Sequence, residues 1–103
     1  MIVTTTALVE GSPVKQYVGI ATGEVIMAAN VGRDILASFT DLVGGRSKAY
    51  ETKLREARDE AFKEMTQEAS QMGANAIIGV DVNYEVVRQG MLMVAVSGTA
   101  VII

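Results

Sequence analysis

The chain contains no cysteine and no histidine, and it has a single proline among its 103 residues. The absence of cysteine excludes disulfides, thiolate nucleophiles and sulfur-rich zinc sites. The absence of histidine removes the side chain used most often as a general base and as a metal ligand. Acid–base catalysis would therefore fall to Asp, Glu, Lys or Tyr, and the sequence contains no recognisable catalytic pair of these residues. We expect a protein that is not an enzyme and that has no cofactor.

The sequence also lacks an excess of positive charge and has no long apolar runs. Its formal net charge is −3, from twelve acidic and nine basic residues, so nothing in its overall charge would attract a nucleic-acid backbone. The N-terminal stretch MIVTTTALVEGSP lacks the basic start and continuous apolar run of a signal peptide. No run approaches the ~20 apolar residues that span a bilayer. These features predict a cytoplasmic protein without nucleic-acid or membrane partners.

Apolar residues are abundant, although aromatic residues are few. Apolar residues make up 50% of the chain and aromatic residues 5%, so Val, Ile, Leu, Ala and Met must build the core. A chain of this length forms one domain, residues 1–103, which buries roughly two-thirds of its unfolded surface. An apolar surplus that a small core cannot hold commonly lies between subunits. We therefore expect a homo-oligomer.

Two segments in the first third of the chain have the composition of strands. Residues 2–9 mix β-branched residues with threonines and end at the turn cluster 10–13, which contains the proline. Residues 17–29 are again rich in strand-forming residues. Gly19 and Gly23 share one face of this second strand, where a missing side chain permits a bulge or a close backbone approach. We expect a long strand with an irregularity.

After residue 33 the apolar residues change to a helical spacing. Residues 35–43 carry a short apolar stripe, and Gly44-Gly45 provides the left-handed conformation that commonly ends a helix. A longer stripe follows, with apolar residues every three or four positions: Tyr50, Leu54, Ala57, Ala61, Met65, Ala69 and Met72. The sequence therefore predicts one short helix and one long helix that ends at Gly73.

The C-terminal third predicts a β-hairpin. Residues 75–87 and 91–103 are both of strand type, and residues 88–90 join them as a turn. The last strand is apolar on both faces, so both faces must be covered. The long helix can cover one of them. Another subunit or the short helix must cover the rest.

The stretch GGRSKAYETKL, residues 44–54, is the first candidate site. The N–H groups and the dipole at a helix start favour an anion there. However, the stretch lacks the GxxxxGK[ST] spacing of a P-loop and follows no predicted strand. A simpler interpretation is that a glycine ends one helix and Ser47 caps the next. Arg46 then pairs with a carboxylate at a subunit contact or with a small anionic ligand, and we favour the first.

Asp81, Asn83 and Glu85 form the second candidate site, because they project from one face of the strand 75–87. Their oxygen atoms could bind a hard cation such as Ca²⁺ or Mg²⁺. The spacing is common, and the same residues could form a solvated strand face or the polar part of an oligomer. We favour this second interpretation. The methionines lie in apolar stretches, which indicates core filling rather than soft-metal binding.

Four blocks of the sequence carry a resemblance to a known family: GRDI at residues 32–35, GGRS at 44–47, GANA at 73–76 and GTA at 98–100. Their order closely resembles the YbjQ family of small bacterial and archaeal proteins, to which heavy-metal binding is ascribed. The resemblance runs from about residue 2 to the C-terminus. It implies an α+β subunit, a small antiparallel β-sheet against a long helix, assembling into a ring that is typically pentameric. It implies no established activity.

The resemblance also suggests that Arg33, Asp34, Arg46 and Tyr50 serve a shared purpose. An Arg–carboxylate pair across a subunit interface would be bidentate, and a subunit cleft at the same residues could bind a small anionic molecule. The heavy-metal function is not carried over, because heavy metals prefer thiolate and imidazole ligands and the chain has neither. We expect a non-enzymatic homo-oligomer of the YbjQ type, with one short and one long helix against its sheet.

Overall fold

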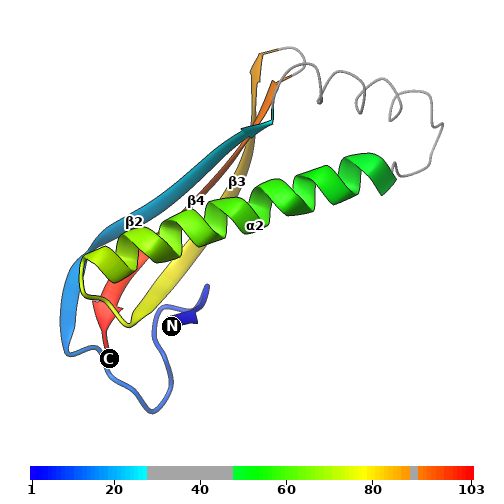
Figure 1. The fold of residues 1–103 in the computed structure, drawn as a ribbon. Coiled ribbons are helices and arrows are strands. Elements are labelled where there is room, and N and C mark those ends of the chain that lie inside the picture. Colours follow the sequence, from blue (N-terminus) through cyan, green and yellow to red (C-terminus); the bar gives the residue numbers. More distant parts are fainter. Residues whose placement is uncertain (28–47, 89–90) are drawn as a thin grey trace.

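A computed structural model describes residues 1–27, 48–88 and 91–103, with the backbone alone for residues 48–50. Among these residues, four strands form one sheet in the order β1-β3-β4-β2, and one long helix lies on a face of this sheet (Figure 1). The predicted α+β class is therefore confirmed. The predicted short helix lies outside the described residues. The elements are β1 (Ile2–Val3), β2 (Gln16–Met27), α2 (Lys48–Gln71), β3 (Ala76–Arg88) and β4 (Met91–Ile102).

The sheet is mixed, which corrects the prediction of a fully antiparallel sheet. Strands β2 and β3 both run antiparallel to β4, whereas β1 pairs with β3 in parallel, with Ile2 opposite Ala76 and Val3 opposite Ile77. The chain after β1 crosses the end of the sheet to reach β2 at the opposite edge (Figure 1). The N-terminal segment therefore adds β1 at the outer edge of β3 and leaves the antiparallel pairing of β3 with β4 intact.

The predicted first strand, residues 2–9, is also much shorter in the structure. The regular strand ends at Val3, although the Thr4 and Thr6 carbonyls still accept from the N–H groups of Val80 and Gly79, at 3.1 and 2.8 Å. Local side-chain bonds accompany them: the Thr4 hydroxyl accepts from the Thr6 N–H at 3.2 Å, and the Thr6 hydroxyl donates to the Leu8 carbonyl at 2.6 Å. Threonine side chains that bond to nearby backbone groups compete with a strand ladder in this way. A strand composition alone therefore overestimated the length of β1.

The predicted C-terminal hairpin is confirmed. Its pairing runs from Ala76 opposite Val101 to Arg88 opposite Met91, with an irregularity between Ile78 and Asp81. The irregularity expected in the second strand is also present, between Tyr17 and Gly19 of β2.

The long helix α2 follows the predicted apolar stripe. Ala57, Ala61, Met65 and Ala69 are all buried against the sheet. After the helix the chain reverses through Gly73, whose φ is +87°. The N–H of Gly73 donates to the Ser70 carbonyl at 3.0 Å and that of Ala74 to the Ala69 carbonyl at 3.1 Å, the paired bonds that close a Schellman motif.

A close backbone approach holds α2 against β2. A Cβ atom at Gly23 would overlap the carbonyl oxygen of Ala61 and would lie 3.0 Å from the backbone nitrogen of Met65. Gly23 of β2 and Ala61 of α2 lie in direct contact, and Ala21 on the same face of β2 is fully buried. The helix therefore rests on β2 through small residues, as the missing side chain of Gly23 allows.

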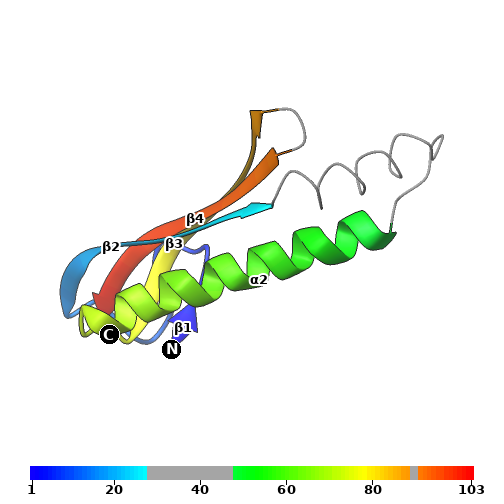
Figure 2. The same cartoon turned by 45° about the horizontal axis from the view of Figure 1, so that its top comes forward.

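Helix α2 covers only part of one sheet face. It makes most of its contacts with β2, fewer with β4 and fewest with β3. Figure 2 shows the hairpin end of β3 and β4 rising away from α2. On the opposite face, Val9 and Val14 of the N-terminal segment pack on a small cluster at the other end of the sheet: Ala76, Ile78 and Val101. The rest of that face has no cover among the described residues.

Substitution of Gly23 by Ala is expected to lower the free energy of unfolding by about 2 kcal/mol or more, because the obstacle is helix backbone that cannot rotate away. Gly19→Ala is a matched control on the same face of β2. Its Cβ would meet the flexible Met72 side chain, 3.3 Å from Sδ, so a loss within about 1 kcal/mol is expected. Urea unfolding of both variants measures the difference, and equal losses would contradict it.

Candidate functional site

The sheet face opposite α2 carries mostly small and polar side chains, together with the large apolar Ile26 and Met93. Residues paired across neighbouring strands project from the same face. The pairing on β4 therefore sets three rows, each written from β2 through β4 to β3: Ile26–Met93–Glu85, Glu24–Ala95–Asn83 and Thr22–Ser97–Asp81. We call this surface the open face, because no described residue covers these three rows.

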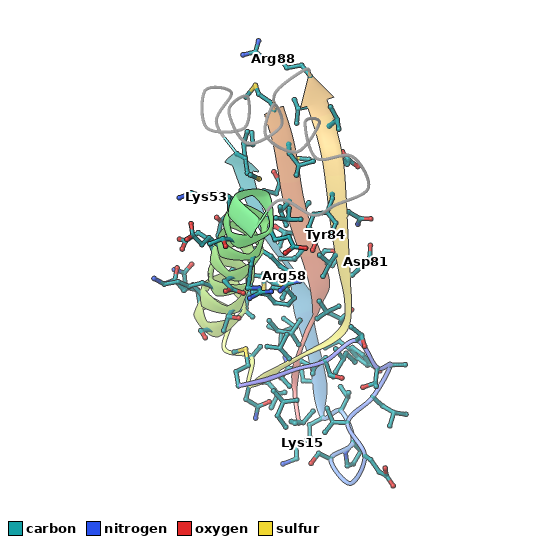
Figure 3. The ribbon with its side chains drawn as sticks, turned by 90° about the vertical axis from the view of Figure 1, so that its right-hand side faces the viewer. Lys15, Lys53, Arg58, Asp81, Tyr84 and Arg88 are labelled. Carbon is teal, nitrogen blue, oxygen red and sulfur yellow. The ribbon has the colours of Figure 1, made fainter. Side chains whose placement is uncertain are left out.

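The predicted trio of Asp81, Asn83 and Glu85 lies on the open face, and all three side chains are exposed. Figure 3 shows Asp81 pointing away from α2. The Asn83 amide donates to Asp81 Oδ2 at 2.6 Å, so one carboxylate oxygen already has a protein partner. Among the described residues, no three acidic side chains come together in a group that could hold a metal ion. The trio forms a polar strand surface in this structure.

The other predicted site residues lie mostly outside the described chain. Arg33, Asp34, Arg46 and Ser47 belong to the stretch that the structure does not describe, and only the backbone of Tyr50 is placed, in the first turn of α2. Their role at a subunit contact or an anion site stays a prediction. Loss of an anion-dependent thermal shift in the variant Arg46→Ala would support the anion interpretation.

Sequence reasoning missed a set of large apolar side chains exposed on the two outer long strands. Their exposed fractions range from 43% for Tyr84 to 75% for Val86. Tyr84 lies on the α2 side of β3 (Figure 3), where it remains 43% exposed. The alternation of side chains along each strand could have indicated that some of them are exposed. It could not have shown that their strands lie at the two outer edges of the sheet. The set consists of Tyr17, Ile20 and Ile26 on β2 and Tyr84, Val86 and Val87 on β3.

Within the part of the chain that the structure describes, both long outer strands have free edges. Strand β2 ends the described sheet on one side. On the other side, β1 pairs only with Ala76 and Ile77, and the last backbone bond from the N-terminal segment joins the Val80 N–H to the Thr4 carbonyl at 3.1 Å. Beyond Val80, no described strand pairs with the outer side of β3. Free N–H and C=O groups along such edges can pair with another chain.

The N-terminal segment encloses a shallow hollow of about 340 Å³ near β1. Glu10 is the one charged residue among those that line it. The hydroxyl groups of Thr4 and Thr6 bond to one another at 2.9 Å, so they are already satisfied. The hollow therefore offers no convergent polar groups for a specific ligand.

Within the described residues, no helix is long and apolar enough to cross a membrane.

Comparisons with known proteins agree with the resemblance. The family model YbjQ_1, described as "Putative heavy-metal-binding", matches residues 1–103. A UPF0145 protein from Bacillus cereus and another from Bacillus thuringiensis subsp. konkukian are each 63% identical over 101 residues, which cover 98% of both chains. A crystal structure from Pediococcus pentosaceus, of a protein with unknown function in the DUF74 family, has a TM-score of 0.62 at 23% identity. The match covers 100% of this chain and 97% of that one, and it supports the fold.

Addition of millimolar Ca²⁺ or Mg²⁺ is expected to change the melting temperature by less than about 1 °C, because hard cations need several oxygen ligands and no three acidic side chains come together among the described residues. Thermal unfolding with and without the cation measures this, with Asp81→Asn as the matched variant. A rise of several degrees that Asp81→Asn abolishes would instead establish a cation site at the trio.

Proposed function

The chain belongs to the YbjQ family, and on this basis we propose that it is a non-enzymatic, cytoplasmic subunit of a homo-oligomeric ring. Its relatives carry names without an assigned activity, and its structural neighbour is described as a protein with unknown function. The observation that carries the proposal is the set of large apolar side chains exposed along both outer strands. Their burial between subunits would account for the apolar surplus of the sequence.

The donor chemistry of the chain does not fit the heavy-metal description of the family. Thiolate and imidazole, the preferred ligands of such metals, are absent because the sequence has no cysteine and no histidine. The thioethers of Met65 and Met27 are buried in the core, at 0% and 7% exposure. Met72 packs against Gly19. These methionines fill space between α2 and the sheet, so we derive no metal function from them.

The energetic argument for assembly follows from the exposed set. Full burial of a large aliphatic or aromatic side chain contributes ~1.5 to 3 kcal/mol. Val86, Ile20 and Tyr17 are each at least 70% exposed, so most of that contribution is not realised in a single subunit. Contacts that cover several such side chains on each subunit would offset the entropy lost on association.

A ring agrees better with this arrangement than a two-fold dimer. The exposed apolar residues occupy two different edges, β2 on one side and β3 on the other. A contact between unlike surfaces leaves one free surface at each end of a pair, so it adds further subunits and forms a ring where the rotation closes, or otherwise an open filament. The family resemblance suggests five subunits.

Native mass spectrometry is expected to find a multiple of the 10.9 kDa subunit mass at micromolar concentration. The expected ring contains five copies of the chain. Light scattering gives an independent mass in solution. A stable monomer in both measurements would overturn the proposal.

The substitution Val86→Lys is expected to weaken assembly at least tenfold, because it places a charge in the proposed contact and costs more than about 1.4 kcal/mol there. Val86 is 75% exposed in the single subunit, so the fold should tolerate the change. Gln67→Lys on the exposed side of α2 adds the same charge away from the sheet and serves as the matched control. Equal assembly of both variants would place the contact elsewhere.

A further inference from the structure

The two free edges of the sheet run in the same direction. Strands β2 and β3 are each antiparallel to β4, so they are parallel to one another within a subunit. Rotation about a ring axis preserves strand direction along that axis. Strand β2 of one subunit can therefore lie beside β3 of the next as a parallel neighbour.

The side chains on the two edges complement one another at equal height. We call two residues level when they pair with the same residue of β4. Thr22 is level with Asp81 through Ser97, and Glu24 is level with Asn83 through Ala95. Between subunits in this register, Asp81 and Glu24 would each lie beside a hydroxyl or amide donor. Glu85 would lie beside Ile26, so no carboxylate would meet another. Charged and polar side chains that match across a strand pair stabilise it, whereas like charges destabilise it.

The side of the sheet that faces α2 has an apolar match at the same heights. Val25 is level with Tyr84 through Val94, and Met27 is level with Val86 through Leu92. Helix α2 lies over β2, so a neighbouring β2 would bring its own helix beside the uncovered part of β3. Tyr84 and Val86 would then gain apolar cover that their own subunit does not provide.

Pairing of β3 with its own copy depends on the register. Centred on Tyr84, a two-fold antiparallel pair would avoid like charges, whereas centred on Asn83 it would place Asp81 opposite Glu85 twice. Like charges directly opposite one another destabilise a strand pair. Pairing of β2 with itself would leave the apolar residues of β3, including Val86 and Val87, exposed.

We infer that residues 81–88 of β3 in one subunit pair with the β2 edge of the next, so that the sheet continues from subunit to subunit. The free part of β3 begins at Asp81 because the N-terminal segment occupies the edge up to Val80. The occupant of this edge is a second copy of the same chain. This inference rests on the proposed ring and adds the contact surface and its register.

Cysteine cross-linking tests the contact directly, because the natural chain has no cysteine. The double variant Thr22→Cys/Asp81→Cys places one thiol on each edge. Within one subunit these positions are separated by β4, and two strand spacings amount to ~9.6 Å, too far for a disulfide. Mild oxidation of the whole chain should therefore join only different subunits. A ladder of bands on a non-reducing gel is expected, with at least half of the protein above the monomer.

The two single variants are the matched controls, and they are expected to stay monomeric on the same gel. Dimers from Thr22→Cys alone or from Asp81→Cys alone would indicate pairing of identical edges and would overturn the inference. The double variant Glu24→Cys/Asn83→Cys probes the adjacent level pair, so the result does not depend on one substitution.

Native mass spectrometry of the same samples under reducing conditions tests the ring separately from the pairing of its strand edges. An oligomer that gives no ladder from either double variant would overturn the edge pairing while the ring proposal stands. A monomeric natural chain would overturn both.

Discussion

One helix cannot cover a sheet of this width, and this limit on coverage determines the rest of the structure. A helix with its side chains is ~10 to 12 Å across, whereas neighbouring strands are ~4.8 Å apart, so one helix covers about two strands. Helix α2 lies over β2 and β4 and leaves most of β3 uncovered. The N-terminal segment covers one end of the opposite face through Val9 and Val14. Among the described residues, large apolar side chains on both outer long strands remain exposed.

The local pattern of the sequence was enough to predict the helix and the hairpin. The stripe from Leu54 to Met72 and the stop at Gly73 depend on neighbours close in the chain, and the structure confirms both. Strand β1 could not be predicted in this way, because its short length and parallel direction depend on hydrogen bonds to β3 far along the sequence. The threonines that favoured a long strand in composition form local side-chain bonds, and their backbone bonds to β3 do not continue as a regular ladder.

The candidate sites were predictable in part. Alternation along a strand places Asp81, Asn83 and Glu85 on one face, as the structure shows. It does not show that the Asn83 amide donates to Asp81, which depends on side-chain conformation. The exposed edge of β3 was missed because burial depends on strand order, and strand order is not a local property. The predicted residues around Arg33 and Arg46 lie outside the described chain, so their role stays a prediction.

The contact between Gly23 and Ala61 also restricts how this sequence can change. The group that a side chain at position 23 would meet is the carbonyl oxygen of residue 61, which every amino acid carries. No replacement at position 61 can remove that oxygen, so a substitution at position 23 has no compensating partner across the contact. Relief would require the whole helix to shift, and the buried residues around Met65 oppose such a shift. Position 23 therefore has no facing side chain whose replacement could make room for a larger residue.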